Sequence, residues 1–222
     1  MHTTVLITGS SQGIGFALAN LFLEQGYHVI GTSRTGKIAI DHQNFTAIAL
    51  DLSKSEGIST SCKQIKDLGK PIDILINNAG IGPDLNVTLP EEDSYRRTLE
   101  VNTTGTVFFT EQLLPVVYRN GKLINVSSKM GSITLTEPSC SVAYRMSKAA
   151  LNMYSKILVN RLQGAPKVGV IHPGWVRTMI SGDDTSGRLS PEESAKGIFD
   201  FVTSDFKNGM FWNVETQSEI PW

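Results

Sequence analysis

The 222-residue chain has few cysteines, almost no net charge and no long apolar run. Its two cysteines, Cys62 and Cys140, match no metal or redox spacing, so we expect reduced thiols and no metal site. A formal net charge of −1 gives no case for a nucleic-acid partner or for an acidic membrane surface. No run is long enough to cross a bilayer, and no basic region followed by an apolar core opens the chain. We therefore expect a cytoplasmic protein without a nucleic-acid or membrane partner.

The chain also has no internal repeat, no linker and no low-complexity segment. Hydrophobic residues make up 40% of it and charged residues 18%, which is typical of a globular protein and not of a disordered one. A chain of this length can bury one sizeable core. We therefore expect residues 1–222 to form a single domain.

The first motif is a glycine-rich turn, Thr8 to Gly15, between an apolar run and a stretch with helical apolar spacing. Glycines permit backbone conformations that are closed to other residues, and they let the chain approach a pyrophosphate closely. The N-terminus of the following helix supplies free N–H groups and a positive dipole end. The turn therefore predicts a dinucleotide site; the alternative is a purely structural turn between strand and helix.

Strand-like and helix-like segments alternate over the rest of the chain. Strands are expected at 5–7, 27–32, 45–50, 72–76, 123–126, 168–171 and 209–212. This alternation predicts an α/β protein, a single-domain Rossmann fold with a doubly wound parallel sheet of about seven strands.

The helical segments carry local signals of their own. Ser53 followed by Glu56 predicts a capping box, in a helix whose apolar face ends at Leu68. Pro115 should kink or end the helix expected at 106–118. Asn102 is unfavourable inside a long helical region, because its amide competes for backbone hydrogen bonds. Such a position is often functional; the alternative is a helix cap.

The second expected strand ends at Ser33 and Arg34, where an NAD site usually has a carboxylate. A guanidinium forms charge-assisted hydrogen bonds with a phosphate, which favours the 2′-phosphate of NADP. Such bonds contribute roughly 1.5–3 kcal/mol, equivalent to a preference of about ten- to a hundredfold. The alternative is that Arg34 is an ordinary exposed arginine.

Several motifs, in this order, resemble the short-chain dehydrogenase/reductase family, and the likeness covers nearly the full length. They are the TGxxxGIG turn from Thr8, NNAG at Asn77–Gly80, a serine at a strand end, Tyr144-x-x-x-Lys148, and HPGWVRT at His172–Thr178, which matches PGxxxT. Tyr144 and Lys148 project from one helical face because they are four residues apart. HPGWVRT, LSPEESAKG at 189–197 and the closing IPW are most similar to the small C-factor-like and sniffer-like carbonyl reductases.

The resemblance implies an NAD(P)(H)-dependent oxidoreductase that transfers hydride between a nicotinamide and a carbonyl or alcohol carbon. The catalytic residues that it implies are Asn102 in a water-linked proton relay, Ser128 at the substrate oxygen, Tyr144 as proton donor and Lys148 on the nicotinamide ribose. The expected cofactor-binding residues are Gly9, Ser11, Gln12, Gly13, Ile14, Gly15, Ser33, Arg34, Asp51, Leu52, Asn78, Ala79, Gly80, Tyr144, Lys148, Pro173, Gly174, Val176 and Thr178. His172 is expected to be structural, because the tyrosine and lysine already supply the acid.

Two points about the catalytic residues stay open at this level. The gap between Ser128 and Tyr144 is longer than in many members, so either Ser127 or Ser128 could face the substrate; the family pattern favours Ser128.

A free tyrosine has a pKa near ~10, and a lysine cation ~4 Å away at an effective dielectric of ~20 contributes up to about 4 kcal/mol, or roughly three pK units. We therefore expect Lys148 to bring the pKa of Tyr144 near neutrality.

The expected cofactor is NADP(H), with NAD(H) as the other possibility. Gln12 stands where many NADP-preferring relatives have a basic residue. The preference for NADP(H) over NAD(H) should therefore lie towards the lower end of the roughly ten- to hundredfold range. The expected substrates are small apolar aldehydes, ketones or quinones, bound beside Ile81, Trp175 and Met179 under a short loop near 178–190. The opposite charges of Asp184 and Arg188 argue against a strongly anionic substrate.

The assembly expected from the resemblance is a homodimer or a homotetramer. The alternative function is a cofactor-sensing or signalling protein with little turnover, which the presence of both Tyr144 and Lys148 disfavours. A sugar epimerase or dehydratase would need a C-terminal substrate domain that this chain has no room for.

Overall fold

The structure is a computed structural model that describes residues 3–181 and 186–222. Its strands are β1 (Thr4–Ile7), β2 (His28–Ser33), β3 (Phe45–Ala49), β4 (Ile72–Asn77), β5 (Val117–Val126), β6 (Lys167–His172), β7 (Met210–Asn213) and β8 (Ser218–Glu219). Its α-helices are α1 (Gly13–Glu24), α2 (Ser55–Asp67), α3 (Glu92–Leu99), α4 (Thr106–Leu113), α5 (Val142–Leu162) and α6 (Pro191–Thr203).

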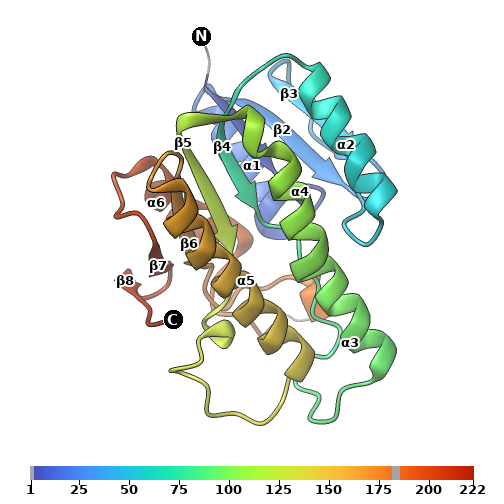
Figure 1. Cartoon of the computed structure of the whole chain (residues 1–222), viewed down its shortest axis with the longest axis vertical. Coiled ribbons are helices and arrows are strands. Elements are labelled where there is room, and N and C mark those ends of the chain that lie inside the picture. The colour runs from blue at the N-terminus through green and yellow to red at the C-terminus, as the bar shows by residue number, and fades with distance from the viewer. Residues whose placement is uncertain (1–2, 182–185) are drawn as a thin grey trace.

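The strands form one sheet in the order β3-β2-β1-β4-β5-β6-β7-β8 (Figure 1). All neighbours are parallel except β7 and β8, which are antiparallel. The predicted Rossmann-like α/β fold is confirmed, but the sheet has eight strands where about seven were expected. The additional strand, β8, has only two residues, so its sequence is too short to show an alternating pattern.

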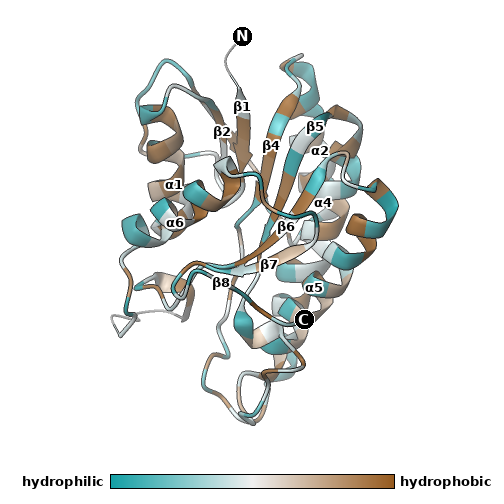
Figure 2. Cartoon of the chain, turned by 90° about the vertical axis from the view of Figure 1, so that its left-hand side faces the viewer, coloured by the Kyte–Doolittle hydropathy of each residue, from teal (hydrophilic) through white to brown (hydrophobic). Residues whose placement is uncertain are grey.

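Helices cover both faces of the sheet. Figure 2 shows α1 and α6 on one side and α2, α4 and α5 on the other. Each face of the sheet has its own hydrophobic core. One core contains Phe22 of α1 and Ile198 of α6, and the other contains Phe109 of α4 and Leu158 of α5. Strands that are buried on both faces are apolar throughout, as in Val5-Leu6-Ile7, and not alternating.

The strand order reverses direction between β1 and β4, since β2 and β3 lie on one side of β1 and β5 to β8 on the other. In open parallel sheets, ligands bind at the carboxyl ends of the strands beside this switch point. The segments after β1, β4, β5 and β6 all leave the sheet at that edge, and they contain most of the predicted site residues.

The predicted capping box at Ser53 is wrong. Helix α2 begins at Ser55, and its N-cap, Lys54, makes no side-chain cap. The N–H and the hydroxyl of Ser53 both donate to Asp51 Oδ1, at 3.0 and 2.6 Å, so the Asp51 side chain holds the preceding turn instead. The expected core positions Cys62 and Ile65 are buried, whereas Leu68 lies beyond the helix and is 37% exposed.

Pro115 ends its helix as predicted, but the helix is shorter than expected. Helix α4 stops at Leu113, Pro115 lies in a short 3₁₀ turn, and Tyr118 is already in β5. The residues after the proline pair with the neighbouring strand, beginning with Val117 against Ile72. Their apolar pattern therefore reflects a long-range strand pairing, which local periodicity does not reveal.

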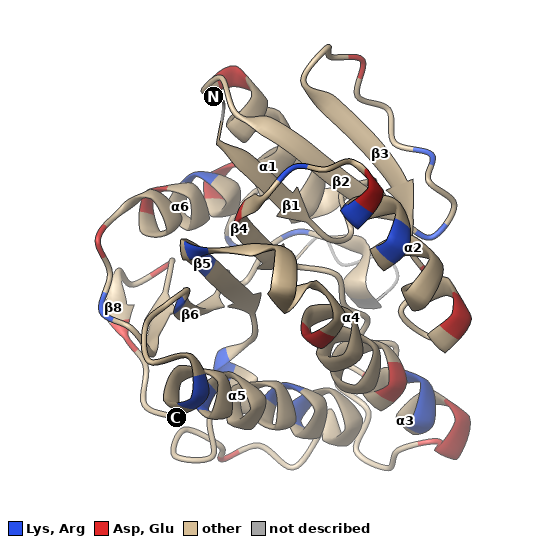
Figure 3. Cartoon of the chain, turned by 45° about the horizontal axis from the view of Figure 1, so that its top comes forward, with Lys and Arg blue, Asp and Glu red and all other residues tan. Residues whose placement is uncertain are grey.

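Basic and acidic residues are interspersed on the outer helices and loops (Figure 3). Within residues 3–181 and 186–222, no helix is long and apolar enough to span a membrane. The same residues contain no group of His, Cys, Asp and Glu side chains that could hold a metal ion.

Candidate active site and dinucleotide cleft

The glycine turn packs directly against the loop that follows β4. Gly9 and Gly13 have φ values of +73° and +57°, which favour glycine. A Cβ on Gly9 would lie 3.0 Å from Ala79 Cα, and a Cβ on Gly15 would collide with the carbonyl oxygen of Gly9. Glycine is therefore required here both by backbone conformation and by close approach.

The start of α1 has the properties of an anion site. Gln12, the N-cap, makes no side-chain cap, and the first turn of the helix contains no acidic residue. Ser11 and Gln12 are exposed at the surface of the turn, while Ile14 packs against the core. A helix N-terminus without a competing side-chain cap or carboxylate fits a pyrophosphate, so the residues present fit a dinucleotide.

The asparagines of NNAG join neighbouring strand ends. Asn77 Nδ2 donates to Asn125 Oδ1 at 2.8 Å, which ties β4 to β5. Asn78 Nδ2 donates to Thr8 O at 2.9 Å, and Thr8 Oγ1 accepts the N–H groups of Asn78 and Ala79, each at 3.0 Å. These bonds fix the loops after β1 and β4 against each other.

Two cations line a hollow of about 620 Å³ at the ends of β2 and β3. Its lining includes Arg34, Asp51 and Lys54. The hydrogen bond from the Ser53 side chain, together with the charges of Lys54 and Arg34, lowers the pKa of Asp51. Ser33 instead donates its hydroxyl to Lys37 O, and it does not line the hollow.

Sequence reasoning missed Lys54, because the expected capping box put a helix start at Ser53. Its only signal was a cation three residues after the aspartate at the end of a strand. Lys54 Nζ lies 3.9 Å from Asp51 Oδ2. The structure thus places a second cation beside Arg34, while Leu52 is buried against the π-helical turn at Gly105.

Asn102 lies in a π-helical turn, Glu100–Gly105, between α3 and α4. Its Oδ1 accepts the N–H of Ile81, and its Nδ2 donates to Ile81 O, both at 2.8 Å. Nδ2 also donates to Ser147 Oγ on α5 at 3.1 Å. Asn102 therefore lies in an irregular part of the helical region. Its side-chain amide does not cap a helix but joins the loop after β4 to α5.

Tyr144 and Lys148 lie on one face of α5, and both are buried. The Ser128 hydroxyl lies close enough to the Tyr144 phenol to lower its pKa, and Lys148 Nζ lies 5.7 Å from the centre of the tyrosine ring. Lys148 Nζ donates to Val126 O at 3.0 Å. The structure thus brings together the serine, tyrosine and lysine of the predicted catalytic set.

Ser127 faces a different partner from Ser128. Its hydroxyl donates to Asn152 Oδ1 at 2.6 Å, and Asn152 Nδ2 donates to Gly131 O at 3.1 Å. Ser127 therefore fastens the end of β5 to α5, and its hydroxyl is occupied. Only Ser128 of this pair contacts the Tyr144 phenol.

The expected neutral pKa of Tyr144 is not found. Burial raises the pKa of Tyr144 to about 12, against the smaller opposing effect of the Ser128 hydrogen bond. Burial also lowers the pKa of Lys148 to about 8. The sequence-based expectation assumed a fully charged lysine in a polar medium, whereas desolvation disfavours both the lysine cation and the phenolate.

Gly80 and the segment after β6 complete the candidate site. A Cβ on Gly80 would lie 3.3 Å from Asn102 Oδ1 and 3.4 Å from Lys148 Nζ. The methyl group of Thr178 would lie 3.5 Å from a Cβ on Gly13, so the PGxxxT segment reaches the glycine turn. Pro173 O accepts the Ser194 hydroxyl at 2.7 Å, Gly174 has a φ of +91°, and Val176 pairs with Leu189.

His172, at the end of β6, has no acid–base partner. It is buried, and among the described residues neither ring nitrogen has a hydrogen-bond partner. Burial, with the nearby charges of Lys129 and Arg188, lowers its pKa to about 3. The imidazole is therefore neutral at physiological pH, as a structural role requires.

The expected substrate walls are partly exposed. Trp175 and Met179 are exposed, and the Arg188 guanidinium lies 5.6 Å from the centre of the Trp175 ring. Arg188 pairs with Glu215 at 2.5 Å. Positions 182–185 of the expected loop, which include Asp184, lie outside the described residues. On either side of them, Met179–Ser181 form a 3₁₀ turn and Leu189 pairs with Val176.

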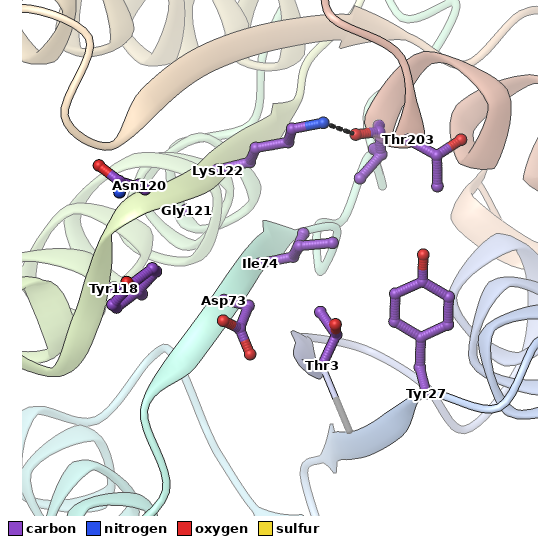
Figure 4. Close-up of a pocket in the computed structure, with 10 residues that line it drawn as sticks. Thr3, Tyr27, Asp73, Ile74, Tyr118, Asn120, Gly121, Lys122 and Thr203 are labelled. Carbon is purple, nitrogen blue, oxygen red and sulfur yellow. Dashed lines mark hydrogen bonds between the residues drawn. The ribbon is translucent and has the colours of Figure 1, made fainter. Parts of the chain in front are cut away.

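A second hollow, of about 270 Å³, lies at the opposite end of the sheet (Figure 4). Asp73, Tyr118 and Lys122 line it, and none of the predicted site residues does. Lys122 Nζ donates to the carbonyl oxygens of Val202 and Ser204, at 2.6 and 2.8 Å. Its charge is therefore used to bind the end of α6.

Comparisons with known proteins agree with this geometry. Residues 3–188 match the family model described as short chain dehydrogenase. The chain is 33% identical over 233 residues to short-chain dehydrogenase anuI of Penicillium roqueforti, covering 93% of this chain and 91% of that protein. Carbonyl reductase Sniffer of D. melanogaster superimposes with a TM-score of 0.89 at 26% identity, and NADPH-bound carbonyl reductase from chicken fatty liver with 0.88 at 25%; both alignments cover 100% of each chain.

Proposed function

The chain belongs to the short-chain dehydrogenase family, and on that basis we propose that it is an NADPH-preferring carbonyl reductase for small apolar aldehydes, ketones or quinones. The observation that carries the proposal is the closeness of the Ser128 hydroxyl to the Tyr144 phenol, with Lys148 beside the tyrosine ring. This arrangement lies at the switch point of the sheet, next to a glycine turn that fits a dinucleotide.

Each end of the cleft has a part in holding the cofactor. The N–H groups at the start of α1 would bind the pyrophosphate, Asp51 and Leu52 would lie by the adenine, and Thr178 would hold the carboxamide. Lys148 would bind the nicotinamide ribose. When bound, the nicotinamide supplies the hydride.

Tyr144 is the proton donor in the direction of reduction. Its raised pKa, about 12, keeps the phenol protonated at neutral pH, which is the form a donor needs. The Ser128 hydroxyl, which already contacts the phenol, would hydrogen-bond the carbonyl oxygen of the substrate. Proton transfer and hydrogen bonding then act on the same oxygen atom.

In the water-linked relay that the family resemblance implies, Lys148 would return the proton to Tyr144, and Asn102 would position the relay. Both border Gly80, where a side chain would come within 3.4 Å of Lys148 Nζ and 3.3 Å of Asn102 Oδ1. With its pKa lowered to about 8, Lys148 can both hold and release a proton near neutrality. The buried Asn102 amide keeps the loop after β4 in place around this path.

The preference for NADPH rests on Arg34 and Lys54. Both border the hollow at the ends of β2 and β3, where a 2′-phosphate would be attracted by their charges. Lys54 provides the second cation that Gln12 does not. We therefore expect a preference in the upper part of the roughly ten- to hundredfold range.

The decisive experiment is a cofactor-oxidation screen over aldehydes, ketones, quinones and steroids, run with NADPH and with NADH. We expect NADPH-dependent turnover of several small or flat apolar carbonyl compounds with modest selectivity, because the described walls are exposed and apolar. Strict selectivity for one phosphorylated or coenzyme A-linked substrate would contradict the substrate class. Tight NADPH binding without turnover of any carbonyl would favour the cofactor-sensing alternative.

A further inference from the structure

The helix that carries Tyr144 begins without a cap of its own. Its N-cap residue, Ser141, has a left-handed backbone with φ 60° and makes no side-chain hydrogen bond to the helix. The first turn of α5 contains no acidic residue. Because the first N–H groups of a helix have no partner within it, the start of α5 depends on another segment.

That segment is the loop after β4. Asp84 is only 3% exposed, and its Oδ2 accepts the N–H of Ala143 at 3.0 Å. The N–H of Ser141 donates to Val87 O at 2.8 Å, and Ser141 Oγ accepts the N–H of Asn86 at 2.9 Å. These bonds fasten residues 84–87 to residues 141–143, immediately before the tyrosine.

The carboxylate is the strongest element of this contact. A negative charge at a helix N-terminus is favoured by the helix dipole, and a charged acceptor makes a stronger hydrogen bond than a neutral one. The same loop also packs on the tyrosine ring, since a Cβ on Gly82 would lie 3.1 Å from Tyr144 Cδ2. The loop thus lies against both the backbone before Tyr144 and its ring.

We propose that Asp84 is a positioning residue for Tyr144: by capping α5 from the loop after β4, it holds the phenol beside Ser128. Ala143 is the residue directly before the tyrosine, and its N–H donates to the Asp84 carboxylate. Releasing it lets the first helical turn shift or fray, and a displacement of about 1 Å at a catalytic group can reduce turnover by up to about a hundredfold. This inference rests on the proposed function, in which Tyr144 donates the proton.

The test compares three variants in the full chain. Asp84→Ala removes the acceptor, and we expect kcat to fall about tenfold with the KM and Kd for NADPH unchanged within about twofold. Asp84→Asn keeps an oxygen acceptor and should restore kcat to within about threefold of wild type. Asp73→Ala is the matched control: Asp73 Oδ2 accepts the N–H of Thr4 at 2.7 Å, at the opposite end of the sheet (Figure 4). It should lower the melting temperature but leave kcat within about twofold.

A fully active Asp84→Ala variant would overturn the inference, and so would equal losses of kcat in the alanine and asparagine variants or in Asp73→Ala. If Asp84→Ala does not fold, Asp84→Glu replaces it: the extra methylene displaces the acceptor, and kcat should fall at least about threefold.

Amide hydrogen exchange over residues 142–146 separates this inference from the proposed function. Faster exchange in Asp84→Ala than in Asp84→Asn supports the cap even if the wild type reduces no carbonyl compound, an outcome that would defeat the proposed function alone. Unchanged exchange in Asp84→Ala would overturn the cap whatever the turnover.

Discussion

The hydroxyl of Ser128, at the end of β5, lies close enough to the phenol of Tyr144, in the first turn of α5, to lower its pKa. The contact joins a hydrogen-bond donor and a proton donor that can act on one substrate oxygen. It also opposes the rise in the Tyr144 pKa that burial causes.

Tyr144→Phe removes the proton donor and little else, because the ring remains and only the hydroxyl is lost. We expect kcat to fall by about two to four orders of magnitude, the usual contribution of general acid–base catalysis. Cofactor affinity, measured by fluorescence titration with NADPH, should stay within about threefold. Near-normal turnover in the phenylalanine variant would exclude Tyr144 as the donor.

The two adjacent serines provide a matched pair of variants. Ser128→Ala should reduce kcat by about ten- to a hundredfold, because the hydrogen bond to the substrate oxygen is lost. Ser127→Ala removes a hydroxyl that Asn152 binds, so it should lower the melting temperature with kcat within about threefold of wild type. The reverse order of kcat losses would show that Ser127 acts on the substrate.

Cofactor preference can be tested at the two cations of the hollow. Arg34→Asp should reverse the order of kcat/KM for NADPH and NADH, because a carboxylate repels the 2′-phosphate. Lys54→Ala should reduce the NADPH preference by roughly three- to tenfold. Lys63→Ala is the control, since Lys63 is exposed on α2 and pairs with Asp67 at 3.1 Å. An unchanged ratio in Lys54→Ala would make Arg34 the sole determinant.

Much of the fold could be predicted from the sequence, because buried parallel strands and amphipathic helices have distinct local patterns. The glycine turn also follows from local rules, whereas the NNAG tetrapeptide was identified by its resemblance to the family. Their structural reason is close packing, as at Gly9 against Ala79. Asn102, which was singled out as unfavourable in a helix, lies in a π-helical turn that the sequence did not predict.

The features that were missed depend on contacts between distant segments. The start of β5, for example, is set by pairing with β4. The start of α2 is the exception, because the local turn between Asp51 and Ser53 sets it. Burial could not be read from sequence, so the pKa of Tyr144 was placed near neutrality when desolvation raises it. Lys54 and Asp84 carry no motif, and only the fold brings them to Arg34 and to the start of α5.

His172 should make the folded protein sensitive to mild acid. Burial lowers its pKa to about 3 in the folded state, whereas an unfolded histidine titrates near ~6.5. As the pH falls below about 6.5, the unfolded chain binds a proton that the folded chain does not. The free energy of unfolding therefore decreases, by up to about 1.4 kcal/mol per pH unit, until the folded pKa is reached.

His172→Leu removes the imidazole that binds this proton in the unfolded chain. It also removes the two buried ring nitrogens that lack partners among the described residues. Urea unfolding should show a stability at about pH 7.5 equal to or above that of wild type, since the buried side chain becomes apolar. Between about pH 6 and pH 4, the free energy of unfolding should fall less in the variant than in wild type, by as much as about 1 kcal/mol per pH unit. If the two proteins lose stability in parallel over that range, His172 is protonated in the folded state and the structural role assigned to its neutral form is wrong.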